Sequence, residues 1–277
     1  RMVYAPPGYL LYVRDGTLLA HPFDAQALRF TSNPIPVAEQ LRYFQPTGMA
    51  DYSVSENGVL VYQALSTRRR LAMVSRTGVE IREIGASGDY ESPRSSPDGQ
   101  RLAVNLTDPR TGTTDVWIYE LSRENPMRFT FEPGMENLPI WSPDGQKIVF
   151  AADRGVPPIL VLKALSDSGP GEQLTETRRW VQYACDWSLD GKFIIYRDGQ
   201  TNTGDDLWLL PMFGERKPTV YLRTQFNERD ARFSPDGRWV VYVSDESGRP
   251  EVYVQSFQGG AGKTKVSNGG GEQPQWR

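Results

Sequence analysis

The sequence predicts an all-β fold, a six-bladed β-propeller in which each blade has four strands. Three observations predict it: a repeat with a spacing of 46 residues, an Asp-Gly hairpin signal in that repeat, and an apolar strand after each turn. Four short strands in about 40 to 50 residues are typical of propeller blades. We predict a single domain over residues 1–277, because all-β folds often exceed 200 residues as one unit.

The repeat is clearest at four hairpin turns with the sequences SPDG, SPDG, SLDG and SPDG, which end at Gly99, Gly145, Gly191 and Gly237. Asp-Gly between apolar runs favours a tight hairpin, because both residues reach positive φ at low cost. A weaker copy has Gly58 at its turn, and a copy that lacks its first strand has Gly8 there. Six turns predict six blades.

Each copy supplies the remaining strands in order. The strand after the turn is apolar on both faces, as at 147–150 and 239–243, which indicates burial between neighbouring blades. Third strands are predicted at 115–121, 159–162, 206–210 and 251–254, and shorter fourth strands at 127–130, 172–175 and 265–267. The Ser and Asp of each turn are expected to bind turn backbone, and Trp141, Trp187, Phe233 and Trp276 to pack between blades.

The two ends of the chain predict a closed ring. Residues 271–276 match the segment that precedes each Asp-Gly turn, and the first copy has no such segment of its own. We therefore expect 271–276 to pair with 9–13, so that the C-terminal strand completes the N-terminal blade and no sheet edge stays exposed.

Several kinds of chemistry are disfavoured. The net charge of −3 without a clustered basic face argues against nucleic acid. The single His21 and single Cys185 leave no His-rich or His-Cys metal site, and no G-x-S-x-G motif is present. No apolar run approaches the ~18 residues of a membrane span. No cofactor is expected, although calcium held by Asp115, Asp205, Asp206 and Glu251 is an alternative to turn capping by these acids.

The predicted binding site lies four residues before the aromatic position of each repeat. The residues there are Ala50, Glu91, Asn137, Tyr183, Arg229 and Glu272, and Asp51, Asp230 and Arg232 are neighbours. Residues that only hold the fold should repeat from blade to blade, whereas these differ in size and charge. Such convergent polar groups suit a ligand at the mouth of a central channel. The alternative is that they fill the channel and satisfy one another.

The pattern W-S-P-D-G followed by an apolar strand, an Asp and a second apolar strand resembles the TolB-like propellers, whose repeats are WD-repeat-like. The opening LLYVRDGTLLAHPFDAQALRF, followed by PVAEQ, also resembles the C-terminal propellers of bacterial serine/threonine protein kinases. These resemblances imply a non-catalytic module that binds a protein or a small molecule at the channel rim, on the periplasmic side of the membrane. They also imply a kinase domain, and possible tethering by a membrane segment, elsewhere in a longer chain.

Two other functions stay open. One is a TolB-type component of an envelope complex that makes protein–protein contacts. The other is an enzyme at the propeller mouth, such as a lactonase or a lyase, against which the single histidine weighs.

Overall fold

The structure is a computed structural model. It describes residues 2–5, 8–14, 17–38, 43–44, 49–50, 52–54, 60–62, 69–75, 77, 79–123, 126–154, 157–176, 180–200, 204–257 and 262–276. Every regular element in these ranges is a β-strand, and the strands pair antiparallel wherever their register is given, which confirms the all-β prediction. No helix among the described residues is long and apolar enough to cross a membrane.

The chain divides into two compact units, which we describe separately. The N-terminal unit comprises residues 1–91 and 106–114, and the C-terminal unit comprises residues 92–105 and 115–277.

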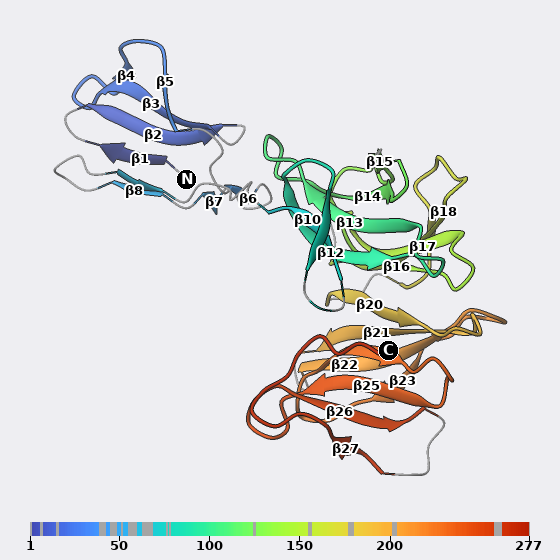
Figure 1. Ribbon diagram of the computed structural model, residues 1–277. Helices are drawn as coiled ribbons and strands as arrows, with labels where there is room; N and C mark the ends of the chain where they lie inside the picture. The colour runs from blue at the N-terminus through green and yellow to red at the C-terminus, as the bar shows by residue number, and fades with distance from the viewer. Residues whose placement is uncertain are drawn as a thin grey trace. The chain divides into compact units, whose positions relative to one another are not determined.

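Four four-stranded sheets follow one another along the second part of the chain, coloured from green to red in Figure 1. The first contains β12 (Asp89–Ser95), β13 (Arg101–Thr107), β14 (Thr114–Glu120) and β15 (Pro126–Arg128). The second contains β16 (Met135–Trp141), β17 (Lys147–Asp153), β18 (Ile159–Ala164) and β19 (Glu172–Gln173). The third contains β20 (Gln182–Trp187), β21 (Phe193–Gln200), β22 (Gly204–Pro211) and β23 (Thr219–Leu222). The fourth contains β24 (Glu228–Phe233), β25 (Trp239–Ser244), β26 (Glu251–Ser256) and β27 (Thr264–Lys265). Each sheet is one predicted blade, with its strands in sequence order.

The N-terminal strands form smaller groups. One sheet contains β1 (Met2–Ala5), β2 (Tyr9–Arg14), β3 (Thr17–Asp24), β4 (Arg29–Phe30) and β5 (Ile35–Ala38). Three two-stranded pairs follow: β6 (Tyr43–Phe44) with β7 (Met49–Ala50), β8 (Tyr52–Val54) with β9 (Leu60–Tyr62), and β10 (Leu71–Val74) with β11 (Glu80–Ile84). The pair β8–β9 is the hairpin predicted around Gly58, which itself lies outside the described residues.

The Asp-Gly turns form as predicted. At the turn after β16, the Ser142 hydroxyl donates to Asp144 at 2.5 Å and accepts the Lys147 amide at 2.9 Å, while Asp144 accepts the Gln146 amide at 3.0 Å. Gly145 has a φ of 65°. The same bonds recur at Ser96, Ser188 and Ser234. These bonds lower the pKa of the turn aspartates, that of Asp236 to about 2.

The first strands of consecutive sheets lie against one another in the C-terminal unit: β16 contacts β20, and β20 contacts β24. We call β12, β16, β20 and β24 the inner strands. Trp141 at the end of β16 is 7% exposed and packs with Ala103 and Val116 of the preceding sheet. Its indole donates to the Arg94 carbonyl of β12 at 2.8 Å. This confirms the predicted role of the repeat aromatic between blades.

The structure does not confirm the predicted ring closure. Strand β2 pairs with β3 on one side and with β1 on the other, so 271–276 does not pair with 9–13. Met2–Ala5 supplies the first strand that the repeat pattern missed, because this copy lacks the W-S-P-D-G signature. Residues 271–276 form no strand. The structure therefore confirms blades of four strands but not six of them.

The C-terminal segment 271–276 nevertheless lies beside β24. The Trp276 indole donates to the Arg232 carbonyl at 3.1 Å, which repeats the bond from Trp141 to Arg94. Gln273 also has the positive φ found at Leu138 of β16 and at Asp230 of β24. The segment thus occupies the place of a further inner strand next to the fourth sheet.

Candidate binding site

The inner strands share an irregularity at the predicted site positions. The pairing of β16 with β17 shifts between Asn137 and Ile140, and that of β24 with β25 shifts between Arg229 and Arg232. Within these bulges Leu138 has a φ of 53° and Asp230 a φ of 54°, where non-glycine residues carry strain. A bulge redirects the neighbouring side chains. The backbone of these inner strands is thus similar from blade to blade, whereas the side chains differ.

The predicted site residues are only partly brought together. Arg229 and Glu272 form an ion pair at 2.5 Å. Tyr183 lies under the guanidinium of Arg197, whose carbon is 4.7 Å from the ring centroid. The Asn137 side-chain oxygen is buried with no hydrogen-bond partner in the described part of the chain.

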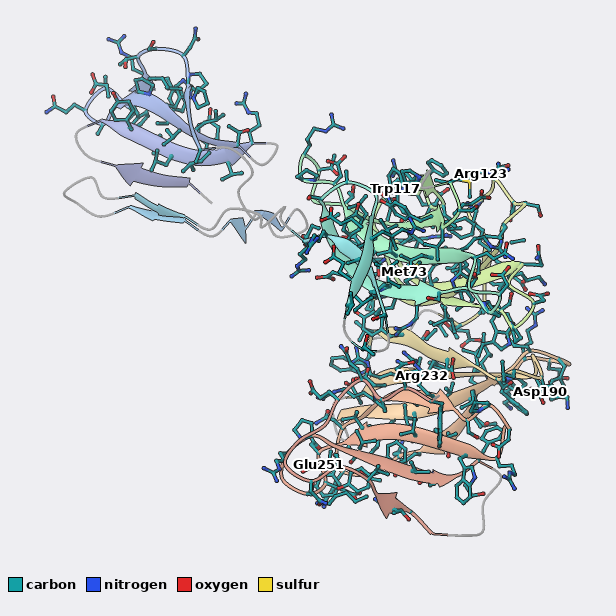
Figure 2. All side chains as sticks on the ribbon, viewed as in Figure 1. Met73, Trp117, Arg123, Asp190, Arg232 and Glu251 are labelled. Atoms are coloured by element: carbon teal, nitrogen blue, oxygen red, sulfur yellow. The ribbon has the colours of Figure 1, made fainter. Side chains whose placement is uncertain are left out.

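The other predicted site residues lie elsewhere or are not described. Glu91 belongs to the N-terminal unit and pairs with Arg69 at 3.2 Å. Asp51 and the side chain of Ala50 lie outside what the structure describes. Asp230 and Arg232 lie on β24, three and one residues before its end, and Figure 2 labels Arg232 there.

A cavity of about 570 Å³ lies farther along the same inner strands, toward the Asp-Gly turns. We call it the inner-strand cavity. Five residues that line it occupy equivalent positions, each one residue before the aromatic position of its repeat: Arg94, Ile140, Asp186, Arg232 and Gln275. All of them belong to the C-terminal unit. Four inner strands and the C-terminal segment therefore converge on one hollow.

Two arginines in this cavity lack a fixed counter-ion. The Arg94 guanidinium donates to the Pro93 carbonyl at 3.4 Å, and the Arg232 guanidinium donates to the Ala231 carbonyl at 3.1 Å. Neither makes an ion pair with a carboxylate among the described residues. Burial, and next the positive charge of Arg232, lower the pKa of Arg94 to about 10.

Asp186 is the acid that lines the cavity. Its Oδ2 accepts the backbone N–H of Phe233 at 2.8 Å, which ties β20 to β24. Burial raises the pKa of Asp186, and the charge of Arg232 opposes that shift. Asp230 also acts electrostatically on Arg94 but does not line the cavity. The cavity walls thus present two guanidinium groups and one carboxylate, which suits an anionic group of a ligand.

The rest of the wall is largely aromatic and proline. Trp141, Trp187 and Trp276 line it with Pro93 and Pro143. Rigid apolar walls with a few convergent polar groups are the usual composition of a binding pocket.

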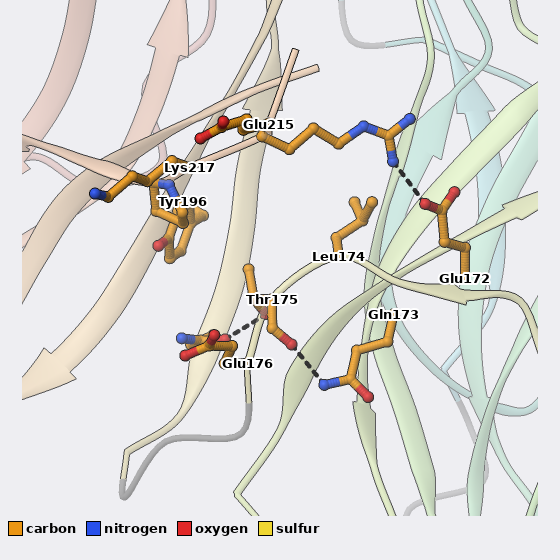
Figure 3. Close-up of a pocket in the computed structure, with 11 residues that line it drawn as sticks. Glu172, Gln173, Leu174, Thr175, Glu176, Tyr196, Glu215 and Lys217 are labelled. Carbon is orange, nitrogen blue, oxygen red and sulfur yellow. Dashed lines mark hydrogen bonds and ion pairs between the residues drawn. The ribbon is translucent and has the colours of Figure 1, made fainter. Parts of the chain in front are cut away.

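A second hollow of about 620 Å³ lies at the outer edge, between β19 and the loop before β23 (Figure 3). Its polar side chains largely bond to one another. Arg216 pairs with Glu172 at 2.7 Å, and Gln173 donates to the Thr175 carbonyl at 2.7 Å. The Thr175 hydroxyl in turn donates to the buried Gln182 at 2.5 Å. Glu215 and Lys217 also line this hollow, so its wall presents charged groups of both signs.

The acids considered for calcium are ion-paired with arginine. Asp115 pairs with Arg128 and Asp206 with Arg223, both at 2.9 Å. Asp205 and Glu251 pair likewise with Arg197 and Arg249. Among the residues that the structure describes, no group of three or more His, Cys, Asp or Glu side chains could hold a metal ion. Calcium binding stays a prediction without support from this geometry.

The single histidine and the single cysteine of the chain are both held in structural contacts. The Nε2–H of His21 donates to the Ser32 carbonyl at 2.8 Å, and the ring stacks on Phe30. Cys185 is buried beside the inner-strand cavity, and burial raises the pKa of its thiol, the opposite of what a reactive cysteine needs.

Sequence reasoning missed Arg94, Asp186 and Gln275. Variation between repeats also marks the position one residue before the aromatic position, where residues that line the cavity lie. At that later position the residues Arg, Ile, Asp, Arg and Gln differ as much as those of the predicted rim.

The fold is that of a β-propeller, and the cavity lies along its inner strands. Residues 52–208 match PD40, the TolB β-propeller domain, over more than half of the chain. The chain belongs to this family.

Known proteins agree with that assignment. The chain is 27% identical over 199 residues to the Tol-Pal system protein TolB of Francisella tularensis subsp. tularensis, covering 70% of this chain and 43% of that protein. It is 25% identical to the uncharacterized peptidase YuxL of Bacillus subtilis, over 62% of this chain and 33% of that one. The chain thus spans less than half the length of these curated relatives. The crystal structure of TolB from Acinetobacter baumannii matches with a TM-score of 0.63 at 17% identity, over 96% of this chain and 67% of that one, which shows a shared fold.

Proposed function

We propose that this chain is a non-catalytic binding propeller that holds a segment of a partner protein in the inner-strand cavity. One observation carries the proposal: five equivalent inner positions, which a purely structural role would keep alike, present different side chains to a single hollow. The two unpaired arginines and the aromatic wall supply polar and apolar contacts together.

A TolB-type role in protein–protein contact is the form of this proposal that the relatives favour, because one of them is a Tol-Pal system protein. We further expect that the protein lies outside the cytoplasm, on the periplasmic side. We also expect residues 1–277 to form one propeller domain. The relatives named above include no kinase, so a sensor role behind a kinase domain rests on the sequence resemblance alone. A catalytic role would need a further domain or an activated nucleophile, whereas burial raises the pKa of the Cys185 thiol that lines the cavity.

The test is a selection of peptides from a randomised twelve-residue library on the immobilised protein. Gln275→Trp places a bulky ring on an exposed residue that lines the inner-strand cavity, whereas Lys217→Trp does the same in the outer hollow. We expect selected peptides to lose at least tenfold in affinity for the Gln275 variant and to keep it for the Lys217 variant. The opposite pattern, or a library without any enrichment, would count against the proposal.

A further inference from the structure

We infer that the inner-strand cavity contains a carboxylate subsite, formed by Arg94 and Arg232, that recognises an acidic residue in a peptide segment of the partner. This inference rests on the proposed function and names the chemistry of its ligand. It starts from the two guanidinium groups that reach one cavity from β12 and β24, two inner strands that are separated in the chain by two whole blades.

The backbones of both arginines are fixed by equivalent bonds. The carbonyl of Arg94 accepts the Trp141 indole at 2.8 Å, and that of Arg232 accepts the Trp276 indole at 3.1 Å. Each arginine is therefore held by the aromatic residue of the next inner strand, and each aromatic residue also lines the cavity. Such pre-organisation lowers the entropy cost of binding.

Neither arginine forms an ion pair with a carboxylate in the described part of the chain, although Asp186 and Asp230 attract the charge of Arg94. The side-chain hydrogen bonds of both arginines go to neighbouring backbone carbonyls. Elsewhere in the C-terminal unit, by contrast, Arg128, Arg197, Arg223 and Arg249 each pair with an acid. The cavity lining thus holds two partly buried guanidinium groups and one carboxylate, which favours an incoming anion, and a planar carboxylate suits the guanidinium fork in a bidentate geometry.

The wall favours a carboxylate on a peptide over a free phosphate. Three tryptophans and three prolines, Pro93, Pro97 and Pro143, surround the two cations. An acidic side chain next to an aromatic or aliphatic one would use both kinds of surface. A small hydrated oxyanion would leave the apolar wall in contact with water.

Asp186 allows a test in which the affinity for the ligand should rise instead of fall. Its Oδ2 accepts the Phe233 N–H, and the side-chain oxygen of asparagine can keep that bond. Asp186→Asn removes a negative charge from the cavity while it retains the link between β20 and β24. A carboxylate ligand should therefore bind more tightly to this variant.

The experiment uses the same peptide library on four proteins: wild type, Arg94→Met with Arg232→Met, Asp186→Asn, and the control Arg238→Met. Arg238 is exposed on a turn, where it pairs with Asp236 at 2.6 Å. We expect enrichment of Asp or Glu beside an aromatic or aliphatic residue. For the best peptide, calorimetry should show a loss of tenfold or more in the double variant, a gain of about threefold in Asp186→Asn, and no change in the control.

The outcomes separate this inference from the proposed function. Enriched peptides without acidic residues, or acidic peptides that bind the double variant unchanged, would overturn the carboxylate subsite and leave peptide binding intact. Binding of inorganic phosphate at micromolar concentration without enrichment of acidic peptides would also overturn it. No enrichment of any peptide would overturn the proposed function, and the inference with it. Circular dichroism of the double variant should match wild type, and Arg94→Lys with Arg232→Lys, which keeps both charges, should retain part of the affinity.

Discussion

At the scale of single residues, the buried acids of the inner strands are the most informative groups. Glu136 and Glu228 are fully buried and occupy equivalent positions on β16 and β24, where β20 has Gln182. Burial raises the pKa of each glutamate to about 7, and Asp115 and Asp206 add to the respective shifts by repulsion. Thr224 donates to Glu228, as Thr175 does to Gln182. The repeat thus places either a glutamine or a glutamate with a raised pKa here.

The first prediction concerns the pH dependence of stability. A carboxyl group whose folded pKa is raised from 4.5 to about 7 stabilises the fold fully below pH 4.5, and that stability is lost as the pH rises to 7. Glu136→Gln introduces the residue type found at the equivalent position, Gln182. The variant should lose up to about 3 kcal/mol less stability than wild type between pH 5 and pH 8. Urea denaturation at both pH values measures it.

The control for that prediction is Glu120→Gln, because Glu120 is exposed. It should leave the difference between pH 5 and pH 8 as in wild type. If the Glu136 variant also showed the wild-type difference, the burial argument for this carboxyl group would be wrong.

At the scale of elements, neighbouring sheets are joined by side chains that bind the bulge backbone. Asn105 of β13 is 1% exposed. It donates to the Glu136 carbonyl at 2.9 Å and accepts the Leu138 amide at 3.0 Å. The Asn105 bonds hold the strained bulge at Leu138 in place. Asp186 links β20 to the end of β24 through the Phe233 amide.

The second prediction is that Asn105→Ala destabilises the protein by about 2–4 kcal/mol, because it leaves the buried Glu136 carbonyl and the Leu138 amide without partners. Thermal or urea unfolding measures the loss. Asn105→Asp keeps the acceptor for the Leu138 amide but loses the donor to the Glu136 carbonyl. Its loss of stability should therefore come from the missing donor bond, and it should grow with pH. A variant Asn105→Ala as stable as wild type would show that the bulge holds its shape without this clamp.

The third prediction concerns Gly134 at the start of β16. A Cβ there would lie 1.8 Å from the Asp153 carbonyl oxygen, at a φ of 126°. Gly237, in contrast, has a φ of 69° and open space around it. Gly237→Ala should cost about 1–2 kcal/mol for the left-handed backbone alone, and Gly134→Ala clearly more. Equal losses in unfolding free energy would mean that the backbone at Gly134 relaxes freely.

At the scale of the whole molecule, the sequence predicted the parts that repeat and failed where the repeat is imperfect. The four turns from Ser96 to Gly237 and their sheets follow from local hairpin chemistry and the spacing of 46 residues. Strand β1 was missed because Met2–Ala5 carries no turn signal of its own. Asn137, Tyr183 and Arg229 of the predicted site lie on inner strands, but the sequence carries no signal for the positive φ of Leu138 and Asp230 beside them.

The fourth prediction concerns the C-terminal segment. Deleting residues 271–277 removes no strand pairing, and Trp276 is 37% exposed. We therefore expect a modest loss of stability, about 1–3 kcal/mol, but a large loss of peptide affinity, because Gln275 and Trp276 form part of the cavity wall. Calorimetry and thermal unfolding of the truncated protein measure both. Unfolding of the whole C-terminal unit by this deletion would show that the segment is structural instead.

The central claim is that the partner segment lies in the inner-strand cavity. A crystal structure of the protein with the best selected peptide tests it most directly. We predict density for the peptide between Arg94 and Arg232, with an acidic side chain within hydrogen-bond distance of both guanidinium groups and an apolar neighbour against the tryptophans. A peptide that instead lies in the outer hollow at Glu172 and Arg216, or beside Asn137 and Tyr183 with the two arginines untouched, would contradict the claim.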